Sequence, residues 1–254
     1  MYFLSPRKVH LFGIQDEAIK TQINYVLDES EVINKGPNGT LSLVFDAIKK
    51  FDKGEKHLKL TCDNAVGQNK NNITLWFCLY LVICGYYESV ELNFMIAGHT
   101  KFSPDRNFGM IKKRYRKSTI YSKEEFVRVA EESSSLNKVQ CYEDGKGFQY
   151  LDFKRKLEPY FIRLPNIAKY HHFFFSADNV KIKEFVDSDW EEFDLLKDDG
   201  RERKEIIKEI RNLVFAILPP KSLSLERQEY LYEKIRPLLP KKYWNTLPLP
   251  TLQC

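Results

Sequence analysis

Residues 58–97 read LKLTCDNAVGQNKNNITLWFCLYLVICGYYESVELNFMIA and hold three successive elements. Leu58–Cys62 alternates apolar and polar residues, which predicts a half-buried strand. Ile73–Cys84 is nearly all apolar, and its length together with a glycine at its end favours a buried helix over a buried strand. Val90–Ala97 alternates again. A strand, a helix and a strand in succession predict a crossover connection in a partly parallel sheet.

The flanking segments extend this pattern in both directions. Upstream, Val9–Ile14 and Ile23–Leu27 are β-prone and predict a hairpin or meander, and Thr40 is the expected N-cap of an amphipathic helix. Downstream, Ser103 followed by proline predicts another helix start, and Ser122 with a glutamate three residues later forms a capping box. Strands that alternate with helices in this order predict an α/β fold.

The loop between the first strand and the apolar helix is the most polar stretch of the chain. Asp63 offers a hard oxygen ligand for Mg²⁺ or Mn²⁺, and the other polar side chains could meet phosphates or orient water. These side chains are Asn64, Gln68, Asn69, Lys70 and Asn71. An Asx turn followed by a helix cap at Asn71 or Asn72 explains the same residues equally well.

A second polar loop follows the strand that ends at Ala97. It contains His99 and leads to Asp105 in the first turn of the next predicted helix. Loops at the carboxyl ends of two strands can converge, and Asp63 and Asp105 could then hold metal ions about 3.5–4 Å apart, as in phosphoryl-transfer sites. The simpler interpretation is a carboxylate that complements the helix dipole and a structural histidine.

The charge of the chain is concentrated beside this second loop. The formal net charge is +5, and the residues between His99 and Lys117 carry seven cations against Asp105 alone. The cations are Lys101, Arg106, Lys112, Lys113, Arg114, Arg116 and Lys117. Such an excess favours a phosphate backbone as the partner over a merely solvated helix face.

The helix that carries these cations is predicted to bury a stripe of Phe108, Ile111 and Tyr115. The run from Lys112 to Lys117 could also serve as a nuclear localisation patch.

Composition excludes several other classes of protein. The chain has 254 residues, of which 43% are hydrophobic, so it is neither a disordered tail nor a disulfide-dense mini-protein. The five cysteines include no C-x-x-C pair, which favours a reducing, intracellular environment. The N-terminus lacks the pattern of a signal peptide, and the longest apolar run is too short to span a bilayer. No membrane partner is expected.

The domain organisation is predicted to be sequential. We expect an α/β core over residues 1–135, an α+β region over 148–246 and a loose tail over 247–254. The second region contains an aromatic strand at His171–Phe175 and a charged helix within residues 200–215.

The two polar loops also carry motifs of a known family. D-N-x-x-G-Q-N-K-N begins at Asp63, and G-H-T-K-x-x-x-D-x-x-F-G begins at Gly98 and leads into the basic helix. These motifs resemble an uncharacterised eukaryotic domain family considered transposon-derived, which is similar to DDE-type transposases with a ribonuclease H fold. Further landmarks at Pro6–Gly13 and Tyr170–Phe173 extend the resemblance over nearly the whole chain.

This resemblance implies a ribonuclease H-like mixed sheet and assigns roles to the polar residues. Asp63 would match the acid at the end of the fourth strand and Asp105 the acid on the helix after the fifth. The two would hold Mg²⁺ or Mn²⁺, and His99 would orient a water or a phosphate. The family's first acid lies upstream of the region at which this chain begins, so we expect the first central strand to be missing.

The resulting expectation is a transposase-derived, DNA-binding nuclear protein. Its metal-dependent polynucleotidyl-transferase or nuclease site would be a relic or incomplete, and Lys70 and the basic helix would contact DNA. The alternative is a non-catalytic DNA-binding, chromatin-binding or protein-interaction module domesticated from a transposon.

Overall fold

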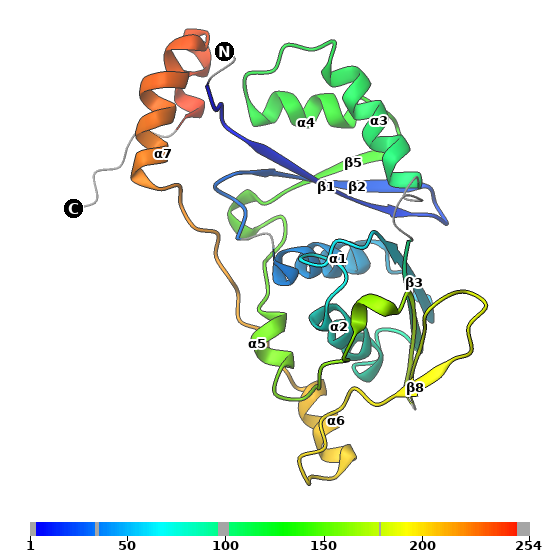
Figure 1. Ribbon diagram of the computed structural model, residues 1–254. Helices are drawn as coiled ribbons and strands as arrows, with labels where there is room; N and C mark the ends of the chain where they lie inside the picture. Colours follow the sequence, from blue (N-terminus) through cyan, green and yellow to red (C-terminus); the bar gives the residue numbers. More distant parts are fainter. Residues whose placement is uncertain (1–3, 34–35, 96–101, 178, 248–254) are drawn as a thin grey trace. The chain divides into compact units, whose positions relative to one another are not determined.

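A computed structural model describes residues 4–33, 36–95, 102–177 and 179–247 of the chain (Figure 1). The chain forms two compact units. The first unit comprises residues 1–33, 102–149 and 219–254, and the second comprises residues 34–101 and 150–218. The units are therefore interleaved along the chain, whereas the sequence predicted consecutive domains.

The first unit is built on a three-stranded sheet. β1 (Val9–Asp16) and β2 (Thr21–Asp28) form the predicted antiparallel hairpin. β5 (Asn137–Cys141) pairs with β2 in parallel. β5 therefore falls between the predicted regions 1–135 and 148–246, because its backbone completes a sheet that begins over a hundred residues earlier.

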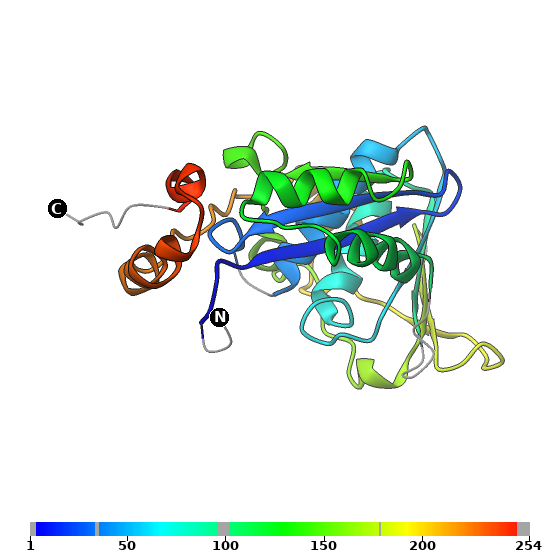
Figure 2. The same cartoon turned by 90° about the horizontal axis from the view of Figure 1, so that it is seen from above.

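Helices cover one side of this sheet. Figure 2 shows α3 (Ser103–Tyr115) and α4 (Lys123–Glu131) across the three strands. The C-terminal part of the unit contains α7 (Leu225–Tyr230), which continues into a π-helical turn at Leu231–Ile235. Short 3₁₀ turns η1 (Glu143–Gly145), η4 (Arg236–Leu238) and η5 (Lys241–Thr246) complete the unit.

The second unit contains a five-stranded mixed sheet in the order β3-β4-β6-β7-β8. The strands are β3 (His57–Cys62), β4 (Ser89–Phe94), β6 (His172–Ser176), β7 (Val180–Lys183) and β8 (Glu191–Phe193). β3 and β4 are parallel, and the remaining neighbours are antiparallel. The predicted strand–helix–strand crossover is confirmed.

The core of the second unit surrounds α2 (Asn72–Ile83), the crossover helix. Every residue of α2 from Thr74 to Ile83 is buried, because the helix packs against the sheet and against other helices at once. These neighbours are α1 (Pro37–Phe51), α5 (Phe153–Leu157) and α6 (Arg203–Arg211). The short turn η2 (Ile167–Lys169) precedes β6. An apolar helix with no polar face requires this complete enclosure.

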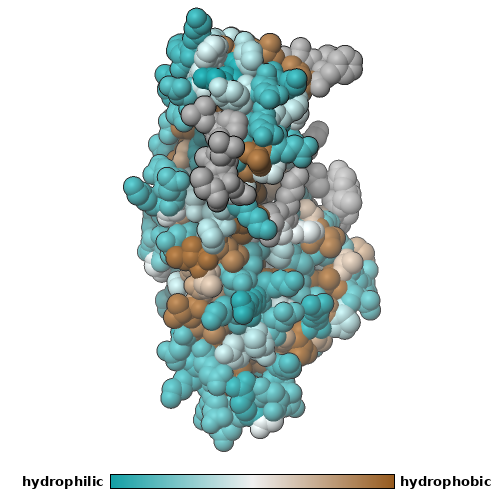
Figure 3. All heavy atoms as spheres, turned by 90° about the vertical axis from the view of Figure 1, so that its left-hand side faces the viewer, coloured by the Kyte–Doolittle hydropathy of each residue, from teal (hydrophilic) through white to brown (hydrophobic). Residues whose placement is uncertain are grey.

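The predicted fold class is confirmed as mixed α/β. Its strands are distributed differently from the expectation, since they form two sheets and the C-terminal strands β6–β8 extend the sheet of β3 and β4. Within the described residues, no helix is both long and apolar enough to cross a membrane. On the face shown in Figure 3, hydrophilic side chains predominate and hydrophobic ones form separate patches.

Several helix starts were predicted correctly and two were not. Asn71 caps α2 by accepting a hydrogen bond from the backbone N–H of Thr74, and Ser122 caps α4. α1 begins at Pro37 rather than after Thr40, and Phe102 rather than Ser103 is the cap residue of α3. In both helices a proline occupies the first turn, where its missing N–H costs nothing.

Candidate functional site

The polar loop after β3 lies where α/β proteins commonly bind ligands. β3 and β4 are parallel, so their carboxyl ends meet at one edge of the sheet. The loop from Asp63 to Asn71 leaves β3 at that edge and leads into α2. The structure therefore confirms the predicted position of Asp63 at a strand end.

The carboxylate of Asp63 is exposed and organises its own loop. Its Oδ1 accepts hydrogen bonds from the backbone N–H of Ala65 at 3.0 Å and from Nδ2 of Asn69 at 2.7 Å. In the described part of the chain, Oδ2 accepts no hydrogen bond. The bonds of Oδ1 agree with the Asx turn that the sequence offered as the structural interpretation of this loop. Oδ2 can still bind a ligand.

Asn64 carries an acceptor without a partner. Its Nδ2 donates to the carbonyl of Met95 at the end of β4. Its Oδ1 is buried and has no hydrogen-bond partner among the described residues. An unsatisfied buried oxygen costs about 1–3 kcal/mol, and a cation or an ordered water would remove that cost.

Lys70 is buried rather than presented to solvent. The residue is 3% exposed, and its Nζ donates to the carbonyl of Ala168 at 2.9 Å. Its ammonium lies 5.4 Å from the ring centroid of Phe94. Burial lowers the pKa of Lys70. Lys70 therefore connects the loop to the segment before β6. The predicted contact with DNA would require its side chain to leave this position.

The remaining loop amides are also used locally. Nδ2 of Asn71 donates to the carbonyl of Gln68 at 3.2 Å, while its Oδ1 caps α2. Asn69 holds Asp63, as described above. Two other predicted site residues, His99 and Lys101, lie outside the described residues.

Asp105 stands in the first turn of α3, in the first unit. Its Oδ2 accepts a hydrogen bond from the backbone N–H of Phe102 at 3.1 Å, which closes the start of the helix. Asp63 belongs to the second unit. The shared metal site of Asp63 and Asp105 therefore stays a prediction. Within the described ranges, no group of three histidine, cysteine or acidic side chains could hold a metal ion.

The predicted basic helix is α3, and most of its cations are exposed. Among the described residues, only Arg114 has an acidic partner, Glu132. The other exposed cations of the helix and its end are Arg106, Lys112, Lys113, Arg116 and Lys117. None of these five forms an ion pair in the part of the chain that the structure describes. The face they occupy is available to a polyanion.

The inward side of α3 differs from the predicted apolar stripe. Ile111 is buried as expected, but Tyr115 is 49% exposed and its ring contacts Phe126 of α4. Asn107, a polar residue, is as deeply buried as Ile111, since each is 3% exposed. The ring of Phe108 lies over Gly13 of β1, so close that a Cβ on that glycine would come within 2.6 Å of it.

Asn107 belongs to a chain of buried amides under the helix. Its Nδ2 donates to Oε1 of Gln15 at 2.7 Å and to Oε1 of Gln22 at 3.1 Å. Gln22 in turn donates to Asn24 at 2.7 Å, and Asn24 donates to Asn137 at 3.2 Å. These bonds link α3 to β1, β2 and β5. Buried amides that satisfy one another fix a single packing arrangement.

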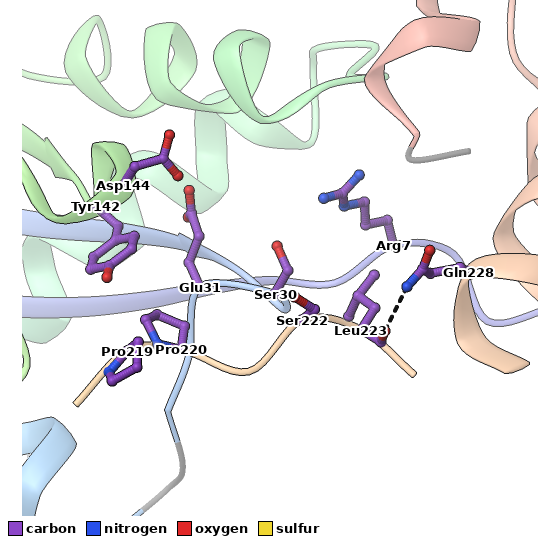
Figure 4. Close-up of a pocket in the computed structure, with 10 residues that line it drawn as sticks. All are labelled: Arg7, Ser30, Glu31, Tyr142, Asp144, Pro219, Pro220, Ser222, Leu223 and Gln228. Carbon is purple, nitrogen blue, oxygen red and sulfur yellow. Dashed lines mark hydrogen bonds between the residues drawn. The ribbon is translucent and has the colours of Figure 1, made fainter. Parts of the chain in front are cut away.

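The sequence analysis missed a pocket of about 520 Å³ in the first unit. The residues that line it are Arg7, Ser30, Glu31, Tyr142, Asp144, Pro219, Pro220, Ser222, Leu223 and Gln228 (Figure 4). It lies beyond the carboxyl ends of the parallel strands β2 and β5. Glu143 and Asp144 beside it have φ of 52° and 54°, an uncommon conformation for residues other than glycine.

Two charged groups of this pocket, Arg7 and Glu31, already have partners. The Arg7 guanidinium is bound to the carboxylate of Asp28 and to the carbonyl of Thr246. Glu31 pairs with Lys123 at 2.5 Å. No sequence pattern pointed to the pocket, because it depends on the pairing of β2 with β5.

The fold and these surfaces define an α/β protein with a polar strand-end loop and an exposed basic helix. Residues 4–191 match the family described as Domain of unknown function (DUF7869), which is about three quarters of the chain. The chain belongs to this family. No curated protein and no solved structure matched.

Proposed function

We propose that this protein binds DNA through the exposed face of α3. The observation that carries the proposal is a set of five exposed cations that form no ion pair with any described residue. They lie on or next to a helix whose other side is fixed to the sheet by Asn107 and Ile111. Lys and Arg side chains that replace condensed counterions supply most of the affinity of proteins for a phosphate backbone. A rigidly held helix presents them without further ordering cost.

The proposal concerns binding rather than strand cleavage. Binding by α3 uses residues of the first unit alone, whereas cleavage in the transposase manner needs Asp63 and Asp105, which belong to different units. Descent from a transposase is supported by the motif resemblance. A DNA-binding protein that has kept part of a transposase site agrees with the motif resemblance and with the exposed cations of α3.

The test compares two variants of equal charge. The α3 variant replaces four cations with Gln: Lys112, Lys113, Arg116 and Lys117. The control replaces four exposed lysines of the second unit with Gln: Lys53, Lys197, Lys204 and Lys208. Binding to a labelled duplex is measured by fluorescence anisotropy between 50 and 200 mM salt, a range in which phosphate contacts change the affinity strongly.

We expect the α3 variant to lose affinity and to reduce the slope of log K against log salt by about 0.9 per lost phosphate contact. The control should keep nearly the slope of the parent protein. Equal slopes for the parent and the α3 variant, or a parent that shows no salt-dependent binding, would overturn the proposal.

We propose, second, a weak Mg²⁺ or Mn²⁺ site at Asp63 and Asn64. Oδ1 of Asn64 and Oδ2 of Asp63 are hard oxygen ligands on adjacent residues, and neither accepts a hydrogen bond from a described residue. Mg²⁺ commonly keeps several waters and binds through one or two carboxylates, so this small ligand set fits it. A bound ion would supply charge stabilisation to a phosphate oxygen.

Paramagnetic broadening by Mn²⁺ tests this site without any assay of activity. In ¹H–¹⁵N spectra we expect Mn²⁺ to broaden the amide signals of residues 64–69 first. Asp63→Asn and Asn64→Ala should each weaken that effect, while Asp187→Asn, at an exposed position of the same unit, should leave it unchanged. Broadening that persists in both site variants would exclude these ligands.

A further inference from the structure

The first unit carries a second set of cations near its C-terminal end. No acidic residue follows Glu233, while the segment from Lys234 to Thr246 contains four basic residues. They are Lys234, Arg236, Lys241 and Lys242. We call residues 234–246 the C-terminal basic segment. The sequence analysis missed this segment because acidic stretches elsewhere in the chain offset its charge in the net charge of the chain.

Arg236 is held between two aromatic rings. Its guanidinium carbon lies 4.6 Å from the ring centroid of Tyr232 and 4.6 Å from that of Trp244. Nε1 of Trp244 donates to the carbonyl of Leu239 at 3.1 Å, which fixes that ring. Cation–π contacts on both faces restrict the guanidinium before any ligand arrives.

The hydrogen-bonding capacity of Arg236 is largely unused. Its Nε is buried and has no partner among the described residues, and no acidic side chain in that part of the structure pairs with the guanidinium. A planar guanidinium with free N–H groups matches the oxygens of a phosphate diester. The orphaned donor points to an anionic ligand.

The segment packs around a small apolar cluster and contacts α4 through Tyr243. Leu231, Ile235 and Leu247 form a small buried cluster. The ring of Tyr243 lies 5.1 Å from that of Tyr121, and its hydroxyl donates to Glu125 of α4. α4 also packs against α3, so Tyr243 connects the C-terminal basic segment to the helix pair that includes the basic helix.

The arrangement of the rings decides between possible partners. A membrane anchor or a platform for stacked bases needs free aromatic faces. Here the faces of Tyr232 and Trp244 that meet Arg236 are occupied, and the ammonium of Lys242 lies 4.6 Å from the ring centroid of Tyr243. The rings therefore hold the cations in position, and the cations rather than the aromatic faces are available to bind a ligand.

We propose that the C-terminal basic segment is a second phosphate-contact surface for DNA, with Arg236 as its pre-positioned central residue. This inference rests on the proposed function, since it assigns a further contact on the same polyanion. Backbone contacts of this kind add affinity without reading sequence.

The experiment uses the full chain and the same labelled duplex. One variant combines Arg236→Gln, Lys241→Gln and Lys242→Gln, and its control combines Lys197→Gln, Lys204→Gln and Lys208→Gln. We expect the first to reduce the slope of log K against log salt by about 0.9 per lost contact. The control should reproduce the parent slope.

Three further variants separate phosphate contact from folding: Lys241→Gln with Lys242→Gln, Arg236→Lys, and Arg236→Gln alone. Lys241→Gln with Lys242→Gln removes only exposed charges and should lower the slope by about 0.9 per contact, with an unchanged melting temperature. Arg236→Lys keeps the charge but not the planar fork, so it should bind DNA more weakly than the parent and more tightly than Arg236→Gln.

The outcomes for the two proposals are distinguishable. If the α3 variant loses affinity while the Arg236, Lys241 and Lys242 variant matches its control, the second surface is overturned and DNA binding by α3 stands. If the duplex does not bind the parent protein at all, both proposals fail. If the variant instead loses binding only to anionic lipid vesicles or only to single-stranded RNA, the assignment to DNA is wrong.

Discussion

Asp28 shows how one residue can secure a junction of the first unit. It ends β2, is 5% exposed and faces Arg7, whose Nε and Nη2 contact its two carboxylate oxygens at 2.6 and 2.8 Å. The hydroxyl of Ser30 donates to the same carboxylate at 2.6 Å. A bidentate, nearly buried ion pair of this kind contributes more than an exposed one.

The ionisation of Asp28 makes a testable contribution to stability. Burial by itself would raise the pKa of Asp28, but the hydrogen bonds from Arg7 and Ser30 outweigh it and lower the pKa below its usual value of 3.8. Because the folded pKa is depressed, the contribution is complete above pH 3.8 and is lost as the pH falls through the folded value.

We therefore expect Asp28→Asn to lower the free energy of unfolding by about 2 kcal/mol at neutral pH. The difference from the parent protein should shrink below pH 3.8, as the parent loses the same interaction. Chemical denaturation at several pH values measures both effects, with the exposed Asp187→Asn as the control. A difference that stays constant down to low pH would contradict the ion-pair explanation.

At the scale of elements, α3 is anchored by polar contacts as well as by apolar ones. Asn107 of α3 and three amides of the sheet below it bond to one another in series, and each is at most 3% exposed. The three are Gln22, Asn24 and Asn137. An apolar interface tolerates sliding, whereas donors and acceptors in series satisfy one another in one register only. The amides thus set the position at which α3 presents its cations.

Two substitutions in α3 should separate this network from the helix itself. Asn107→Ala leaves acceptors on Gln15 and Gln22 unpaired in a buried site, so we expect a loss of about 2 kcal/mol in the free energy of unfolding. Gly109→Ala is the matched control, since a Cβ there meets no atom within 4 Å, and it should stabilise the helix by roughly 0.5–1 kcal/mol. Thermal unfolding followed by circular dichroism measures both, and an Asn107→Ala protein as stable as the parent would contradict the role of the network.

At the scale of the whole molecule, the two proposed functions fall in different units. Both basic surfaces belong to the first unit, and the Asp63 loop belongs to the second. The chain passes from the first unit to the second after residue 33 and again after residue 149. Neither unit is one continuous stretch, so each is completed only when distant segments meet.

Local patterns were sufficient for a large part of this structure. β3, α2 and β4 follow from alternation, a nearly continuous apolar run and a capping asparagine, because these signals act between residues a few positions apart. The hairpin of β1 and β2, the cap at Ser122 and the exposed cations of α3 were predictable for the same reason. So was the placement of Asp63 at the end of a strand.

Tertiary contacts decided the rest. β5 is a polar segment that forms a strand because it pairs with β2. Lys70 is buried because its Nζ donates a hydrogen bond to the carbonyl of Ala168, 98 residues away. Likewise, Asn107 is the most buried polar residue of α3 because Gln15 and Gln22 face it from the sheet. A polar side chain is buried at low cost only where hydrogen-bond partners are present. Those partners come from distant parts of the chain, and no local sequence pattern predicts that they lie close together.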